Sequence, residues 1–233
     1  AHIEEDECNA PEFYAGGMKL TLLDGPDGII DADAFEARLN AASRAVHHAQ
    51  PGMLSLTNIT ERGARYSVAQ VTRLAAIAKA QGLPVHMDGA RFANALVAEG
   101  CSAADMTWRA GVDVLSFGGT KNGLLGVEAV VFFDPAKAWE FELRRKRGGH
   151  LYSKHRYLSA QMDAYLTDGL WLDLAARANA SAARLEQGLM GAGATLIHPR
   201  GGNILFAEFP RAAHKALRAA GAVYYDWPGD HGD

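Results

Sequence analysis

Between residues 52 and 133, short apolar segments alternate with helix-like segments, and this alternation constrains the fold more than any other feature. The apolar segments are residues 52–57, 85–87, 112–117 and 129–133. Ser67 is expected to cap a helix that ends at Gly82, and a second helix should run from Arg91 to Glu99. Strands that alternate with helices form βαβ units, and nearly continuous apolar strands are buried on both faces of a parallel sheet. The sequence therefore predicts an α/β fold with a mostly parallel, doubly wound sheet.

The segments outside this alternation predict one more helix and a second domain. A helix is expected over residues 31–49, with Phe35, Leu39 and Val46 on one apolar face. After Pro135 the pattern changes. The sequence there predicts a basic turn at 144–149, a helical region at 154–189 broken near Asp168, strands at 194–197, 204–209 and 223–227, and a helix at 212–220. We therefore expect a large domain over residues 1–145 and a smaller α+β domain over residues 146–233.

Charge and cysteine content argue against several classes of partner. The chain has 23 Lys and Arg residues and 27 Asp and Glu residues, and the net charge of −4 disfavours a general nucleic-acid or membrane-surface binder. No apolar run approaches the roughly 18–20 residues that span a bilayer. Cys8 and Cys101 give no disulfide framework, so a reducing compartment, the cytoplasm, is expected. Neither the His47–His48 pair nor the acidic segment 2–8 matches a zinc spacing, and no metal is predicted.

Polar clusters follow three of the predicted strands. They are residues 57–60 (Thr-Asn-Ile-Thr), residues 88–91 (Asp-Gly-Ala-Arg) and residues 118–121 (Gly-Gly-Thr-Lys). Ligands of open parallel sheets bind at the carboxyl ends of the strands, so a carboxylate, a guanidinium and an amine should share one edge. This set matches what pyridoxal phosphate requires, namely a lysine for a Schiff base and an acid beside the pyridine nitrogen.

Each of these residues also has a purely structural interpretation. Asp88 could cap the helix that begins near Arg91. Lys121 could be a solvated loop lysine, although the surrounding glycines allow close approach of a ligand. The spacing around Lys121 is not that of a phosphate-binding P-loop.

Three segments make the sequence similar to the low-specificity L-threonine aldolases, which are pyridoxal-phosphate enzymes of the aspartate-aminotransferase fold type. These segments are His86–Ala95 (HMDGARFANA), Asp113–Gly123 (DVLSFGGTKNG) and Ala1–Glu12 (AHIEEDECNAPE). The resemblance implies a lyase that cleaves the Cα–Cβ bond of β-hydroxy-α-amino acids, such as threonine, allo-threonine or phenylserine-like compounds, to glycine and an aldehyde. Another lyase reaction (β-elimination), transamination and an inactive truncated relative remain as alternatives. A homodimer or homotetramer is also implied.

The resemblance assigns roles to individual residues. Lys121 would form the Schiff base, and Asp88 would pair with the ring nitrogen. His2 would stack on the ring and help to deprotonate the substrate hydroxyl. Arg91 would contact the substrate carboxylate or the cofactor's phenolic oxygen, and Thr120 would support the lysine loop or a phosphate oxygen.

The sequence departs from the family pattern at two places and at both ends. Thr60 stands where many relatives carry a second histidine, and its hydroxyl would bind the substrate hydroxyl. Asn9 stands where glycine is expected. The phosphate-binding turn and a second carboxylate-binding arginine of the family would lie outside the sequence. We therefore expect a chain that lacks segments at both ends.

Overall fold

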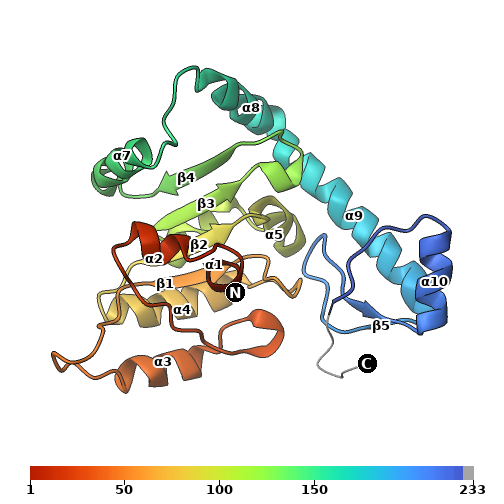
Figure 1. Ribbon diagram of the computed structural model, residues 1–233, viewed down its shortest axis with the longest axis horizontal. Helices are drawn as coiled ribbons and strands as arrows, with labels where there is room; N and C mark the ends of the chain where they lie inside the picture. Colours follow the sequence, from red (N-terminus) through yellow and green to blue (C-terminus); the bar gives the residue numbers. More distant parts are fainter. Residues whose placement is uncertain (228–233) are drawn as a thin grey trace.

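A four-stranded sheet forms the centre of the computed structural model, which describes residues 1–227 (Figure 1). Its strand order is β1-β2-β3-β4, with parallel pairing of β1 (Leu54–Thr57), β2 (Val85–Gly89) and β3 (Val114–Gly118). The last strand, β4 (Glu128–Phe132), is antiparallel to β3, because the short connection between them cannot make a crossover. The mostly parallel α/β sheet that the sequence predicts is confirmed.

The helices around the sheet begin and end where local chemistry requires. Ser67 and Gln70 form a capping box at the start of α4 (Val68–Ala80), and Gly100 ends α5 (Phe92–Glu99) in the left-handed conformation. Side chains from these helices and from the strands form one core. Its fully buried members include Val71, Leu74, Val85, Met87, Phe92, Leu96 and Tyr165.

The helix predicted over residues 31–49 is shorter than expected. Asp31 caps α3 (Ala32–Asn40), whose buried side chains are Phe35 and Leu39. Val46, expected on the same face, is 92% exposed. Beyond Asn40 the Gln50 side chain donates hydrogen bonds to three carbonyl groups of residues 43–48, and such local bonds compete with helix formation.

The basic run at residues 144–147 is helical, which corrects the predicted turn. It ends α7 (Ala138–Arg147), where Arg144 pairs with Glu140 one turn earlier and donates to the Tyr14 carbonyl. Basic side chains at a helix C-terminus interact favourably with the helix dipole. The predicted break near Asp168 is confirmed, since this residue has a positive φ of 52° between α8 (Arg156–Leu166) and α9 (Leu170–Gly191).

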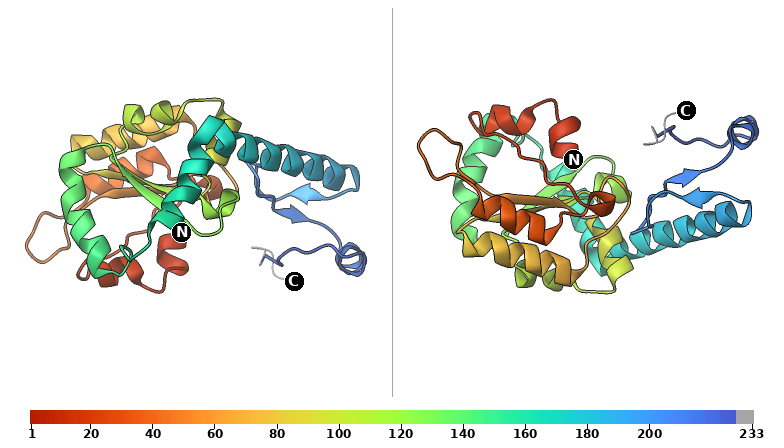
Figure 2. Two further views of the ribbon diagram at one scale, coloured as in Figure 1. Left: turned by 90° about the horizontal axis from the view of Figure 1, so that it is seen from above. Right: turned by 90° about the horizontal axis from the view of Figure 1, so that it is seen from below.

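Beyond α9, a small two-stranded sheet and a helix project from the main body (Figure 2). They are β5 (Thr195–Leu196), β6 (Ala207–Glu208) and α10 (Arg211–Ala219). The strand predicted at 223–227 is absent from the described residues, because Tyr224 packs beside His214 and Phe209 rather than pairing with a strand. The domain boundary at 145/146 stays a prediction, and the end of the second domain lies outside the described residues.

The remaining elements are short. They are α1 (His2–Glu5), α2 (Ala10–Tyr14), η1 (Pro26–Gly28), α6 (Ala103–Met106), η2 (Trp108–Ala110), η3 (Thr120–Asn122), η4 (Pro135–Lys137) and η5 (Thr167–Gly169). Asn9 adopts a left-handed φ of 60° before α2, a conformation that asparagine tolerates in place of glycine. Among residues 1–227, no helix combines the length and the apolar character that a membrane crossing requires.

Candidate active site

The carboxyl ends of β1, β2 and β3 lie at one edge of the sheet. The register places Thr57 beside Asp88 and Asp88 beside Ser116. The backbone N–H of Asn58 continues this pairing by donating to the Asp88 carbonyl at 2.9 Å. The three polar clusters therefore follow neighbouring strands at the same edge, as their position in the sequence predicts.

Asp88 and Arg91 occupy the turn between β2 and α5. One carboxylate oxygen of Asp88 accepts the Ala90 N–H at 3.0 Å, which orders the turn. Burial lowers the pKa of Arg91, whereas the negative charges of Asp88 and Glu61 act in the opposite direction. Arginine stays charged in proteins, so a guanidinium lies here within the field of two carboxylates.

Lys121 lies in η3, directly after β3, and the backbone around it is held from two sides. The Glu128 carboxylate accepts the N–H groups of Gly119 at 3.2 Å and Thr120 at 3.1 Å. On the other side, the Asn122 amide donates to the Tyr165 hydroxyl and, at 2.8 Å, to the Trp171 carbonyl. The Lys121 and Thr120 side chains are exposed. Lys121 makes no ion pair with any residue of the described range.

We expect Asn122→Ala to destabilise the fold by about 1–3 kcal/mol, because the fully buried Tyr165 would lose the only side-chain partner that its hydroxyl has within residues 1–227. Urea denaturation measures the change in the free energy of unfolding. Ser159→Ala on the exposed side of α8 is the matched control. Equal stability of the two variants would refute a stabilising role for Asn122.

His2 begins α1 and contacts two carboxylates. Its backbone N–H donates to Glu61 Oε1 at 2.8 Å, and its ring Nδ1 lies 2.8 Å from Glu7 Oε1. The half-exposed imidazole is thus oriented by an acidic partner on its own segment. Its predicted stacking on a cofactor ring stays a prediction.

Thr60 is 1% exposed, and its hydroxyl is already engaged by backbone groups. The hydroxyl donates to the Asp27 carbonyl at 2.8 Å and accepts the Ala64 N–H at 3.2 Å. This arrangement fixes the loop after β1, and the substrate contact assigned to Thr60 stays a prediction.

The next residue, Glu61, was missed by the sequence analysis. Its signal was an ionisable side chain directly after one of the three strand-end clusters.

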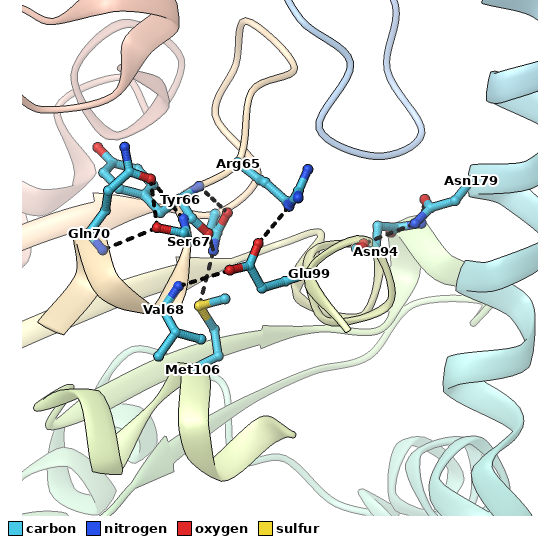
Figure 3. Close-up of polar contacts among 10 residues, drawn as sticks. Arg65, Tyr66, Ser67, Val68, Gln70, Asn94, Glu99, Met106 and Asn179 are labelled. Atoms are coloured by element: carbon cyan, nitrogen blue, oxygen red, sulfur yellow. Dashed lines mark hydrogen bonds and ion pairs between the residues drawn. The ribbon is translucent and has the colours of Figure 1, made fainter. Parts of the chain in front are cut away.

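The loop that carries Thr60 and Glu61 is anchored further along (Figure 3). The buried Asn58 side chain accepts the Tyr66 N–H at 3.1 Å and donates to the Tyr66 carbonyl at 3.3 Å. Arg65 pairs with Glu99 at 3.0 Å, and Glu99 also accepts the Val68 N–H at 3.3 Å. The loop is therefore fixed to both α4 and α5.

A half-buried histidine lies two residues before Asp88 on the same face of β2. His86 Nδ1 is 2.9 Å from Ser55 Oγ, and His86 Nε2 is 2.9 Å from Ser116 Oγ. Burial lowers the pKa of His86, and the charge of Asp88 only partly opposes this. This arrangement leaves no local signal in the sequence, because the two serines come from different strands.

The lowered pKa of His86 predicts a pH dependence of stability. The unfolded chain protonates this side chain near the ordinary value of 6.5 and the folded chain only at lower pH. Between these values the unfolded state binds more protons, so stability is lost as the pH falls below 6.5. Denaturation from pH 7 down to about pH 5 should therefore show a larger loss for the wild type than for His86→Asn. His150→Asn is the control for losing an exposed imidazole, and identical pH profiles for wild type and His86→Asn would contradict the prediction.

Comparison with known proteins decides the family. A profile of the beta-eliminating lyase family matches residues 1–211. The chain belongs to this family. Two curated relatives, both called low specificity L-threonine aldolase, come from a Pseudomonas species and from Pseudomonas aeruginosa. They are 40% identical over 235 and 233 residues, and each alignment covers 100% of this chain and 67% of the relative. The likeness that the three sequence segments indicate is confirmed.

A solved structure agrees with this membership of the beta-eliminating lyase family. The threonine aldolase of Leishmania major superposes with a TM-score of 0.90 at 28% sequence identity. The match covers 100% of this chain and 67% of that structure. The fold of the chain is thus the threonine aldolase fold. The described residues hold no group of three or more His, Cys, Asp or Glu side chains placed to bind a metal ion.

Proposed function

We propose that the chain carries the catalytic centre of a pyridoxal-phosphate-dependent lyase that cleaves β-hydroxy-α-amino acids to glycine and an aldehyde. The observation that carries this proposal is the shared sheet edge that bears Asp88, Arg91 and Lys121 in a member of the beta-eliminating lyase family. The names of the two Pseudomonas relatives support threonine and its analogues as substrates.

The side chains at this edge fit pyridoxal phosphate. Among the described residues, the Asp88 carboxylate accepts a hydrogen bond only from the backbone N–H of Ala90. This leaves one carboxylate oxygen for a protonated ring nitrogen. Lys121 supplies an exposed primary amine on a fixed backbone. When bound, the cofactor would accept into its ring the negative charge that the bond cleavage leaves on Cα.

The residues of the chain then have distinct tasks in the reaction. Asp88 would hold the ring nitrogen and keep it protonated, and Lys121 would bind the cofactor through its amine. Arg91 binds the substrate carboxylate by charge-assisted hydrogen bonds. His2, oriented by Glu7, accepts the proton of the substrate hydroxyl as the Cα–Cβ bond breaks and the aldehyde leaves. The proton that Cα would gain in glycine balances the one that His2 would take from the substrate hydroxyl.

Borohydride trapping tests the proposal. The protein incubated with pyridoxal phosphate should gain a visible absorbance band, lose it on reduction, and carry the reduced label on Lys121 in peptide mass spectrometry. Threonine should then give glycine and acetaldehyde in equal amounts. A protein that gains neither the band nor the label would overturn the proposal.

The family name favours β-elimination as the second candidate reaction. In that reaction threonine loses its hydroxyl group, and the products are ammonia and an oxo acid. Measuring acetaldehyde and ammonia in the same sample distinguishes the two reactions, because only cleavage of the Cα–Cβ bond releases acetaldehyde without ammonia.

We also propose a homodimer or homotetramer that acts in the cytoplasm. Large apolar side chains that are exposed in the single chain support self-association, among them Phe13 at 80%, Leu125 at 92% and Trp139 at 71%. Cys8 and Cys101 are both free thiols, as a reducing compartment favours. Light scattering during gel filtration gives the stoichiometry.

A further inference from the structure

Glu61 is the one acidic residue of the strand-end loops to which the proposed mechanism gives no task. Its Oε1 accepts the backbone N–H of His2 at 2.8 Å, across 59 positions of sequence. His2 is the first residue of α1, and this helix receives no hydrogen bond from the side chain of its own N-cap residue, Ala1. A carboxylate from another segment thus satisfies a free N–H at the start of the helix, where negative charge is also favoured.

The position of Glu61 is set by its loop rather than by the helix that it contacts. Thr60, the preceding residue, is held by Asp27 and Ala64, and Asn58 is held by Tyr66. These contacts fix the backbone on the amino side of Glu61. The carboxylate therefore holds the more exposed segment around His2 in a constant position.

Glu61 also lies within the electrostatic reach of the site. Its charge raises the pKa of Arg91 against the larger effect of burial. Burial raises the pKa of Tyr66 to about 12, and Glu61 adds to that increase. The Glu61 carboxylate therefore acts electrostatically on the residue that would bind the substrate carboxylate, and it contacts the segment that would cover the cofactor ring.

We propose that Glu61 is a positioning residue, which holds the backbone of His2 so that its imidazole, turned by Glu7, points to the reacting hydroxyl. The expected effect of Glu61 on catalysis rests on the proposed function, whereas the hydrogen bond between Glu61 and His2 does not. Glu7 orients the ring and Glu61 fixes the backbone, so the two carboxylates together determine where the base lies.

The kinetic test compares Glu61→Ala with Glu61→Gln. An amide oxygen still accepts the His2 N–H, so Glu61→Gln should lose no more than about threefold in kcat. Glu61→Ala frees the segment, and misplacing a base by about 1 Å costs roughly 10²-fold, so its kcat should fall by about 10- to 100-fold with little change in KM. Glu4→Ala, an exposed residue of the same helix, is the matched control.

A double-mutant cycle tests whether Glu61 acts through His2. In a His2→Ala background, Glu61→Ala should have no further effect on kcat, because the base that it positions is gone. Additive losses would show that Glu61 acts independently and would overturn the proposal. A loss in Glu61→Gln as large as that in Glu61→Ala would also overturn it, since charge rather than hydrogen-bond acceptance would then be required.

A second readout does not depend on activity. The NMR signals of the His2 imidazole, assigned with His2→Gln, should shift in Glu61→Ala and stay in place in Glu4→Ala, with or without cofactor. Unchanged signals in Glu61→Ala would refute the positioning role. If the wild type forms no Lys121 adduct while the His2 signals respond to Glu61, the proposed function fails and the positioning contact stands.

Discussion

Lys121→Ala is expected to abolish the visible absorbance of the protein incubated with pyridoxal phosphate and to lower kcat by at least roughly 10³-fold. The reason is that no other amine follows a strand of the central sheet at the edge that carries Asp88 within the described residues. Covalent attachment through a lysine is what lets such a cofactor exchange readily with an amino-acid substrate.

The measurement for Lys121→Ala combines absorbance, borohydride labelling and aldehyde release. Lys19→Ala removes an exposed lysine far from η3 in the sequence and should retain all three signals. Denaturation curves should be the same for both variants, because the Lys121 side chain is exposed and its loop is held by Glu128 and Asn122. If Lys121→Ala is still fully labelled with the reduced cofactor at another lysine, Lys121 is not the residue that binds the cofactor.

Asp88→Asn should lower kcat by roughly 10²- to 10⁴-fold while the protein stays folded. The amide oxygen of asparagine still accepts the Ala90 N–H, so the turn before α5 is retained. The amide carries no negative charge, and the pyridine nitrogen would therefore no longer be kept protonated. Without that proton, the ring withdraws less charge from the bond that breaks.

Cofactor affinity and turnover should both be lower in Asp88→Asn than in the wild type. Equilibrium dialysis with pyridoxal phosphate measures the first, and aldehyde release measures the second. Asp163→Asn, an exposed acid on α8, is the control for losing one carboxylate. If Asp88→Asn has the turnover of the wild type, Asp88 does not belong to the catalytic centre. The proposed function would then lack the carboxylate on which it depends.

The central sheet could be predicted because its information is local. Each apolar segment from residue 54 to residue 132 carries its own helix caps and turn residues, and neighbouring strands along the chain also pair in space. The small sheet was harder to place, because β5 and β6 contribute two residues each and their pairing depends on a long connection. Residues 223–227 look like a strand in the sequence but lack a strand partner in the structure, because Tyr224 packs beside Phe209 and His214 instead.

The site was predictable to the extent that its residues follow strands. Asp88, Arg91 and Lys121 were brought to one edge by parallel pairing alone. Glu61 and His86 escaped the sequence analysis because their partners, His2, Ser55 and Ser116, come from distant segments. Side-chain contacts of this kind depend on the final packing, which no local pattern encodes.

The two-sided anchoring of the loop around Lys121 has a consequence for how a turnover cycle would proceed. With Gly119 and Thr120 bound to Glu128, and Asn122 bound to α8 and α9, the main chain has little freedom to open or close. If the Lys121 amine binds the cofactor as proposed, it would leave and return by rotating its own four-carbon stem, and rotamer changes of exposed side chains take picoseconds to nanoseconds. Release and recapture of the coenzyme would then proceed without any backbone rearrangement, and the slow events of the cycle would lie in the chemistry or in the departure of the products.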